Sequence, residues 1–174
     1  MSGYYLNLGA GDNYKPGWIN LDLPANPKAD IHCDLEEAEL PLDDDSVNLI
    51  EAAHVIEHVK NIIPLFNELH RVLKRGGILH ITVPEFPCAA AVADLTHVHY
   101  FVPATFTHII NPNAGYDTSG LRGKWALRYM ESLSHDRPIM DRGQGAGGYF
   151  KELEVEFEAV KNNGTKSKEK ITTH

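Results

Sequence analysis

The chain has 174 residues, of which 43% are hydrophobic and 23% are charged, a composition typical of a globular protein large enough to bury its own core. The formal net charge of −8 argues against general electrostatic attraction to a nucleic-acid backbone, so we expect no nucleic-acid partner. No apolar run approaches the roughly 18 residues of a membrane span, and the N-terminus has no secretory signal pattern. We therefore expect no membrane partner, and two cysteines outside any motif favour a cytoplasmic protein.

Residues 4–22 have the pattern of a nucleoside-binding crevice. Apolar residues from Tyr4 onward predict a short strand that runs into Gly9 and Gly11, and a second strand ends at Asp22. Glycines lack a Cβ atom, so the chain can turn sharply there and a ligand can approach the backbone closely. Only seven residues, 12–18, lie between the glycines and the second strand, and they include a proline. We therefore predict that the usual first crossover helix is shortened or lost.

The next segments alternate between strands and a helix. Short apolar runs predict strands at 29–33, 47–52 and 78–83. Apolar residues recur at helical spacing across 61–74, and Gly76 and Gly77 predict the end of that helix. This order is typical of an α/β protein with a Rossmann-like, mostly parallel sheet, in which ligands bind at the carboxyl ends of the strands.

The second half of the chain predicts an antiparallel edge on that sheet. A helix is expected at 103–110, and two strands, at 124–132 and 149–161, can pair with each other. The glycine-containing loop 135–148 is expected to be mobile, and the polar residues 162–174 are expected to form a disordered tail. Residues 1–161 are therefore expected to form a single domain.

The glycine loop does not fit two common nucleotide-binding motifs. A dinucleotide site needs a third glycine, where Tyr14 stands here, and a carboxylate about 20 positions further on, whereas Asp22 comes early. A phosphate-binding Walker loop ends in G-K-[ST], a motif that the sequence lacks. These departures disfavour NAD and nucleoside triphosphates as ligands.

Four segments together resemble the class I S-adenosylmethionine-dependent methyltransferases: LNLGAG, PGWINLDL, CDLEEAELPLDDDSVNLIEAAHVIEHV and ELHRVLKRGGILHITVP. The resemblance, strongest to small bacterial and phage members, covers roughly residues 4–110 and implies S-adenosyl-L-methionine as the cofactor. It implies that Asp22 holds the ribose hydroxyls and that Asp34 accepts a hydrogen bond from the adenine amine. The full set of implied cofactor-binding residues is Asn7, Gly9, Ala10, Gly11, Asp22, Leu23, Asp34, Leu35, Ala53 and His54.

A polar cluster at 94–101 follows the last predicted parallel strand. It resembles the family pattern D-P-T-H-x-R-x-F, which faces the acceptor pocket, with His99 in place of the arginine. The resemblance places Asp94, His97 and His99 at this pocket, and Glu85 is a further candidate. His97 and His54 are candidate catalytic bases, although methyl transfer is an in-line displacement that positioning alone can accelerate. The alternative is a hydrogen-bonded corner that pins the loop to the sheet.

Two histidine patterns raise the alternative of a metal. His54, Glu57 and His58 match the H-x-x-E-H pattern of inverted zinc peptidases, and Asp94, His97 and His99 could share an ion. The peptidase pattern needs a long helix, but here it follows directly on a strand, and the methyltransferase resemblance accounts for the same residues. We therefore expect no metal.

The predicted function is S-adenosylmethionine-dependent methyl transfer to a small-molecule acceptor, with a sugar or nucleotide-sugar among the candidates. One alternative is an S-adenosylmethionine-binding module without methyltransferase activity. Another is a metal-dependent hydrolase that uses the H-x-x-E-H histidines. The short first crossover leaves one face of the sheet thinly covered, which further predicts that the protein forms a homo-oligomer.

Overall fold

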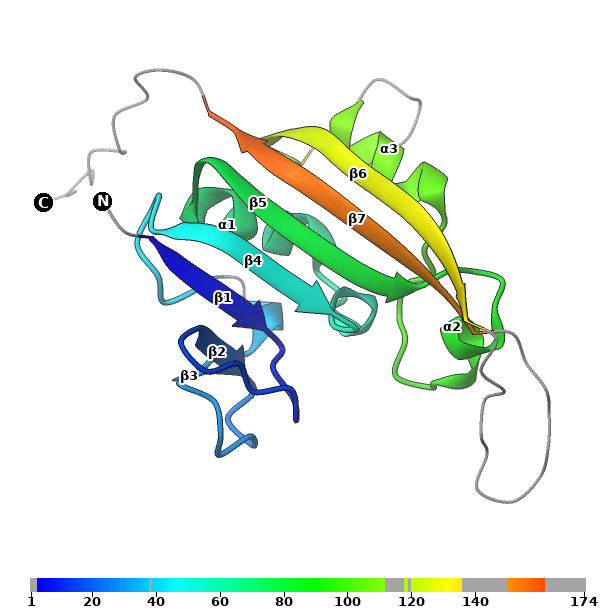
Figure 1. The fold of residues 1–174 in the computed structure, drawn as a ribbon, viewed down its shortest axis with the longest axis horizontal. Helices are drawn as coiled ribbons and strands as arrows, with labels where there is room; N and C mark the ends of the chain where they lie inside the picture. Colours follow the sequence, from blue (N-terminus) through cyan, green and yellow to red (C-terminus); the bar gives the residue numbers. More distant parts are fainter. Residues whose placement is uncertain (1–2, 38, 112–117, 119, 136–149, 162–174) are drawn as a thin grey trace, which may run out of the picture.

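The protein is built around a seven-stranded sheet. A computed structural model describes residues 3–37, 39–111, 118, 120–135 and 150–161. The sheet has the order β3-β2-β1-β4-β5-β7-β6 (Figure 1). Its strands are β1 (Tyr4–Leu8), β2 (Ile19–Asp22), β3 (Ile31–His32), β4 (Val47–Ala53), β5 (Leu73–Pro84), β6 (Lys124–His135) and β7 (Phe150–Val160).

The first five strands run parallel, whereas β7 pairs antiparallel with both β5 and β6. The predicted mostly parallel sheet with an antiparallel edge is therefore confirmed. The predicted loop 135–148 lies outside the described residues from 136 onward, and so does the predicted tail 162–174. Among the described residues, no helix is both long enough and apolar enough to cross a membrane.

The connection between β1 and β2 contains turns but no helix, so the first crossover helix is lost. Two buried asparagines satisfy backbone groups that a helix would otherwise satisfy internally. The Asn7 side chain donates to the carbonyl of Asn13 at 2.7 Å and to the side-chain oxygen of Asn20 at 2.9 Å. Asn20 in turn accepts from the backbone N–H of Lys15 at 2.8 Å and donates to its carbonyl at 3.0 Å.

The helices are short: α1 (Ile62–Val72), α2 (Ala89–Ala93) and α3 (Pro103–Ile110), with 3-10 turns η1 (Leu35–Glu37) and η2 (Ile56–His58). Both α1 and α3 pack on the same residue of β7. The Phe157 ring lies 6.5 Å from that of Phe66 in α1 and 6.0 Å from that of Phe106 in α3. The two helices therefore cover the same face of the sheet, and in Figure 1 both lie behind it.

The end of α1 differs from the prediction. We expected helix through residue 74 and a glycine stop, but α1 ends at Val72 and β5 begins at Leu73. Leu73 pairs with Val47 of β4 and is fully buried, so tertiary packing outweighs the helical spacing of the sequence here. The predicted helix 103–110 matches α3, whereas α2 was not predicted.

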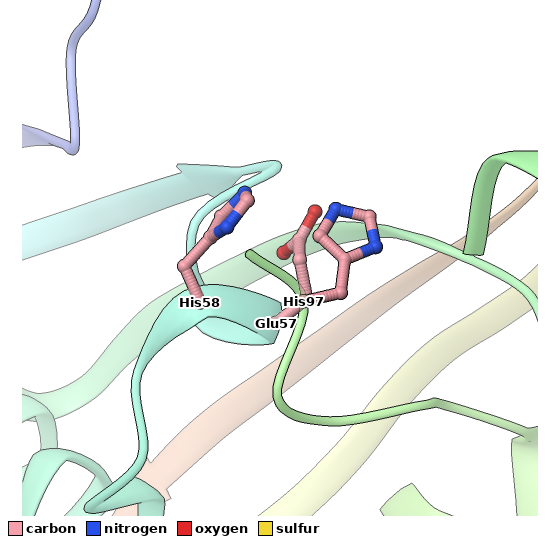
Figure 2. Close-up of side chains that lie close together, drawn as sticks. All are labelled: Glu57, His58 and His97. Atoms are coloured by element: carbon pink, nitrogen blue, oxygen red, sulfur yellow. The ribbon is translucent and has the colours of Figure 1, made fainter. Parts of the chain in front are cut away.

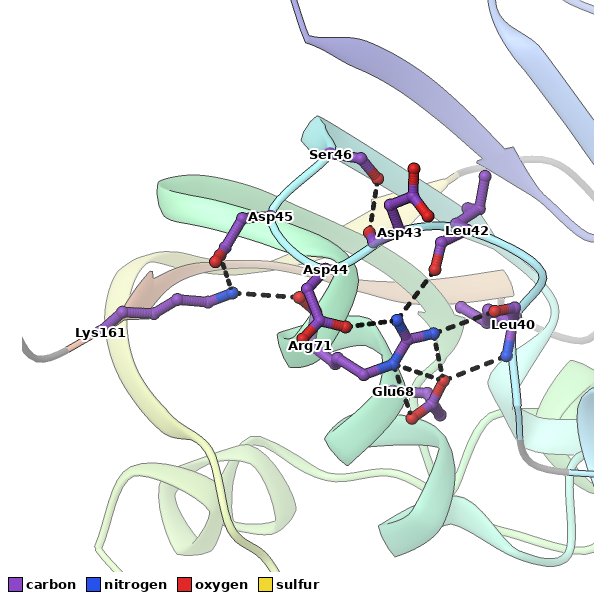
Figure 3. Close-up of polar contacts among 9 residues, drawn as sticks. All are labelled: Leu40, Leu42, Asp43, Asp44, Asp45, Ser46, Glu68, Arg71 and Lys161. Atoms are coloured by element: carbon purple, nitrogen blue, oxygen red, sulfur yellow. Dashed lines mark hydrogen bonds and ion pairs between the residues drawn. The ribbon is translucent and has the colours of Figure 1, made fainter. Parts of the chain in front are cut away.

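The acidic loop before β4 is fastened to α1 by Arg71 (Figure 3). The guanidinium group donates to both carboxylate oxygens of Glu68, and to Asp44 at 2.7 Å. It also donates to the carbonyls of Leu40 at 2.9 Å and Leu42 at 2.8 Å. Because the planar guanidinium group presents several fixed donors, one side chain fixes the whole approach to β4.

Candidate functional site

A cavity of about 350 Å³ opens beyond the carboxyl ends of β1, β2 and β4. This is the edge of a parallel sheet at which ligands are expected. Its lining consists of Gly9, Gly11, Leu21, Asp22, Leu23, Cys33, Asp34, Leu35, Glu36, His54, Val55, His58 and Val59.

The glycine loop needs its glycines for two different reasons. Gly9 and Gly11 have φ values of 62° and 51°, in the left-handed region that side chains disfavour. A Cβ atom on Gly9 would also overlap the side chain of Val55, whereas Gly11 has open space around it. The loop therefore brings backbone, and not side chains, to the mouth of the cavity.

Asp22 is held as a carboxylate at the end of β2. It accepts hydrogen bonds from the backbone N–H groups of Gly11 and Leu23, both at 2.8 Å, and from the Asn26 side chain at 2.6 Å. Partial burial opposes ionisation, but the hydrogen bonds from Asn26, Leu23 and Gly11 outweigh it and lower the pKa of Asp22. At neutral pH the cavity therefore contains an ionised, positioned acceptor.

The opposite wall of the cavity is ordered by two other carboxylates. Asp34 accepts from the backbone N–H of Glu36 at 3.0 Å. Glu36 accepts from the N–H groups of Lys60 at 2.7 Å and Asn61 at 3.2 Å, immediately before α1. The segment Asp34–Glu36 is therefore tied to the start of α1, which fixes this wall relative to the sheet.

His54, the residue after β4, has an unusual backbone conformation. Its φ of 54° is left-handed, which is uncommon for a residue other than glycine. Its ring bonds to Glu152 at 2.8 Å and lies 3.5 Å from Glu57. Glu57, followed by Glu152, raises the pKa of His54, although burial acts in the opposite direction. Neighbouring carboxylates thus favour the imidazolium form of a residue that lines the cavity.

The loop 94–101 is pinned over η2. The backbone N–H groups of Val98 and His99 donate to the carbonyl of Glu57 at 2.8 and 3.2 Å. This brings the ring of His97 within 4.7 Å of the ring of His58, centroid to centroid, and the Glu57 carboxylate lies near both (Figure 2). His58 lines the cavity, so this loop lies beside it.

Residues 13–81 match the family model described as a methyltransferase domain. This stretch of the chain is therefore similar to methyltransferase domains. Among curated proteins, no sequence matches this chain significantly.

Solved structures with a similar fold have low sequence identity. A protein from Bacillus halodurans described as a methyltransferase is 13% identical, with a TM-score of 0.65 over 92% of this chain and 95% of that one. An S-adenosylmethionine-dependent methyltransferase from Mesorhizobium loti is 17% identical, with a TM-score of 0.54 over 89% and 90% of the two chains. The [4+2]-cyclase SpnF is 13% identical, with a TM-score of 0.60 over 92% and 76%.

Most of the residues predicted to bind the cofactor line this cavity of about 350 Å³. Those brought together are Gly9, Gly11, Asp22, Leu23, Asp34, Leu35 and His54. Asn7, Ala10 and Ala53 are outside the lining, and the buried Asn7 amide supports the glycine loop from behind. Lining residues that were not predicted to bind the cofactor are Leu21, Cys33, Glu36, Val55, His58 and Val59. The first four are next to a predicted residue in the sequence, whereas His58 and Val59 lie in the turn that follows His54.

The residues predicted for the acceptor pocket have separate surroundings. Glu85 is buried and accepts from Ser132 and from Lys151, at 3.1 Å for the lysine. The His99 ring donates to the carbonyl of Lys60 at 3.2 Å. Asp94 accepts from the backbone and hydroxyl of Thr96, which lowers the pKa of Asp94. Of these four predicted residues, His97 is the one whose ring contacts His58, which lines the cavity.

The protein also has an apolar cavity of about 380 Å³ between α1 and α3. It is lined mainly by Ile62, Ile63, Phe66, Phe101, Val102 and Ile109. Its lining includes none of the carboxylates or glycines described above.

Proposed function

We propose that the protein transfers the methyl group of S-adenosylmethionine to a small-molecule acceptor, with a sugar or nucleotide-sugar as the first class to test. The observation that carries the proposal is the position of Asp22. Its carboxylate lines the cavity beside the glycine backbone and is held ionised by three hydrogen bonds. An ionised carboxylate in this place suits hydrogen bonds from the paired hydroxyls of a ribose.

The remaining site residues have complementary proposed roles. Gly9 and Gly11 admit the methionine part of the cofactor, and Asp34 and Leu35 hold the adenine. Asn7 and Ala10 support the glycine loop from outside the cavity, and Ala53 precedes His54 at the end of β4. The acceptor binds on the side of loop 94–101, where Asp94, His97 and His99 are found.

Two histidines remain candidates for a general base, and their surroundings differ. His54 is paired with Glu57 and Glu152, which raise the pKa of His54 and favour its protonated form, so it is less available to accept a proton at neutral pH. His97 donates through Nδ1 to the carbonyl of Ala91 at 2.9 Å, which leaves Nε2 as its proton acceptor. His97 is therefore the better candidate for accepting the proton of an acceptor hydroxyl.

Several features support a small soluble acceptor. The net charge of −8 opposes a nucleic-acid substrate, because the many phosphates of its backbone would be repelled. The cavity is no larger than a typical small-molecule site, so a macromolecular acceptor would have to reach it from outside.

The test is calorimetric binding followed by product analysis. We expect S-adenosylmethionine and S-adenosylhomocysteine each to bind with one-to-one stoichiometry. Incubation with S-adenosylmethionine and a panel of sugars and nucleotide-sugars should give a product heavier by one methylene unit, detected by mass spectrometry. Absence of heat with both cofactor forms would overturn the proposal.

A second candidate function is cofactor binding without methyl transfer. The observation that favours it is that the similar structure of SpnF is described as a cyclase, so this fold also accompanies a different reaction. Cofactor binding without any methylated product across the panel would support this candidate.

The third alternative, a hydrolase that uses the H-x-x-E-H histidines, loses its structural basis. His54 follows a strand, and Glu57 and His58 lie in a 3-10 turn, so the two histidines do not share one face of an α-helix.

A further inference from the structure

Glu57 is a buried carboxyl side chain with few polar contacts. Its side chain is 1% exposed, and neither carboxylate oxygen has a hydrogen-bond partner among the described residues. The nearest cation is His54, whose Nδ1 lies 3.5 Å from Oε1. Burial of a carboxylate without hydrogen bonds costs several kcal/mol, so such groups are normally paired or bound to a metal.

Two imidazole rings face this carboxylate (Figure 2). Glu57, His58 and His97 each bring one possible ligand atom to within 4.8 Å of the others. Glu57 and His58 come from η2, and His97 comes from loop 94–101, which is pinned to η2 through the Glu57 carbonyl. The His97 side chain is only 7% exposed, so the cluster is largely shielded from solvent on that side.

In both histidines, the ring is oriented by a hydrogen bond from its Nδ1 atom. The Nδ1 of His97 donates to the carbonyl of Ala91 at 2.9 Å. The hydroxyl of Thr96 donates to Asp94 at 2.6 Å, so it accepts from the Nδ1 of His58 at 2.9 Å. With Nδ1 as the donor in both rings, Nε2 is the nitrogen that each ring can offer to a metal ion. Metal-binding histidines are typically held by such outer hydrogen bonds to carbonyls and carboxylates.

We propose that Glu57, His58 and His97 bind a divalent transition-metal ion of the zinc class. Two imidazole nitrogens and one carboxylate form a common ligand set for Zn²⁺, whereas Mg²⁺ and Ca²⁺ prefer oxygen ligands. The site differs from both metal patterns in the sequence: it omits His54, and it uses neither Asp94 nor His99 as a ligand. Asp94 instead supports His58 through Thr96.

Three protein ligands leave room for an oxygen ligand, and His58 also lines the cofactor cavity. The following step rests on the proposed methyl transfer. An acceptor hydroxyl bound to the ion would release its proton to solvent, and its oxygen would form a bond to the methyl carbon of the cofactor. The carbon–sulfur bond would break with its electron pair returning to sulfur, which leaves S-adenosylhomocysteine. His97 would then be a ligand and not the base.

Metal titration tests the site without any assay of activity. Purified full-length protein is stripped with a chelator, freed of it, and titrated with Zn²⁺ by calorimetry and with Co²⁺ by visible absorption. We expect one equivalent of either ion to bind. E57Q and H97Q should weaken Zn²⁺ binding by at least about 100-fold, because even outer-shell changes typically cost 10–100-fold. T96V should weaken it by roughly tenfold for the same reason.

H80Q is the matched control, because His80 lies in β5, where it pairs with Glu156. Its Zn²⁺ affinity should equal that of the unmodified protein, and circular dichroism should show every variant folded. Failure of the stripped protein to bind Zn²⁺, or equal binding by E57Q and H97Q, would overturn the proposal. Binding of S-adenosylhomocysteine in the presence of chelator distinguishes a failed metal site from a failed cofactor site.

Discussion

At the scale of single residues, the site depends on groups whose charge state is fixed by their neighbours. Asp22 stays ionised because three donors converge on it, and the glycine loop supplies one of them through the backbone N–H of Gly11. The low pKa of Asp22 means that its contribution to folding stability is present above its ordinary pKa and is lost as the pH falls through the lowered value.

Replacement of Asp22 with alanine should weaken binding of S-adenosylhomocysteine by roughly 10- to 100-fold. Hydrogen bonds to a charged group are worth about 1.5–3 kcal/mol, and the variant would lose those made to the ribose. Calorimetry measures the change. D12A is the control, because Asp12 is a fully exposed carboxylate in the same loop. An equal loss in both variants would contradict a specific role for Asp22.

Cys33 offers a chemical probe of the same cavity, which it lines. Burial, followed by the nearby carboxylates of Asp34, Glu37 and Glu68, raises the pKa of Cys33. Because only the thiolate reacts, we expect slow alkylation at neutral pH and a rate that rises as the pH increases beyond the ordinary thiol value. S-adenosylhomocysteine should slow this reaction several-fold.

Cys88 provides an internal reference for that experiment, since its thiol donates to the carbonyl of Lys151 and is outside the cavity lining. Mass spectrometry of tryptic peptides follows both thiols in one sample. Equal protection of the two cysteines by the cofactor product would mean that the effect is global and not due to occupancy of the cavity.

At the scale of elements, two connections between strands are stabilised by hydrogen bonds from polar side chains. The β1–β2 connection relies on the Asn7 and Asn20 amides, and the loop before β4 relies on Arg71. The Arg71 side chain is 26% exposed and its partner Glu68 is 16% exposed, so both are partly shielded from water and salt.

Removal of the Arg71 side chain should lower the free energy of unfolding by about 2–3 kcal/mol. The R71A variant would leave Glu68 and the carbonyls of Leu40 and Leu42 without their donor. Urea denaturation should show a lower midpoint with an unchanged slope. R128A is the control: Arg128 pairs with Glu158 but is 57% exposed, so its loss should cost less than about 0.5 kcal/mol.

The sequence was most informative where local pattern and packing agree. Helix 103–110 and the alternating strand 150–160 could be read directly, and glycine and carboxylate positions located most of the cavity. The sequence was less informative where tertiary packing overrides the local pattern. Leu73 sits at the end of a helical pattern yet belongs to β5, because its pairing with Val47 buries it.

The cluster of Glu57, His58 and His97 could not be derived in the same way. The H-x-x-E-H pattern predicts a partnership between His54 and His58, which lie four positions apart. The structure instead places His58 against His97, because backbone hydrogen bonds bring loop 94–101 onto η2. No local spacing in a sequence encodes such a long-range contact.

At the scale of the whole molecule, the sheet has two unlike faces. Parallel sheets are usually covered on both faces, but here α1 and α3 share one. The opposite face presents a row of partly exposed polar residues, Glu51, His80, Glu156 and Tyr129, which are neighbours across four strands. A hydrogen bond to Glu131 and the surrounding carboxylates raise the pKa of Tyr129 to about 12, a sign of the negative potential on this face.

This face bears on the predicted homo-oligomer, for which we propose pairing of two copies through it. Tyr5, Leu49 and Ile78 form an apolar row suited to contact, but the glutamates would repel across the interface. We therefore expect light scattering to show a monomer at low salt and a dimer at high salt, where the repulsion is screened. The I78E variant should remain monomeric at both. A monomer of the unmodified chain at both salt concentrations would contradict the proposal.

The position of β7 has a consequence for how the chain is made. Among the described residues it is the last strand to be synthesised, yet it lies between β5 and β6, and its Phe157 contacts Phe66, Phe106 and Trp125. Until β7 leaves the ribosome, β6 lacks its neighbour in the sheet and the two helices lack their shared aromatic contact. None of the residues that line the cavity with Asp22 belongs to β7. The growing chain therefore carries every residue of the proposed cofactor site well before it can complete the sheet that supports them.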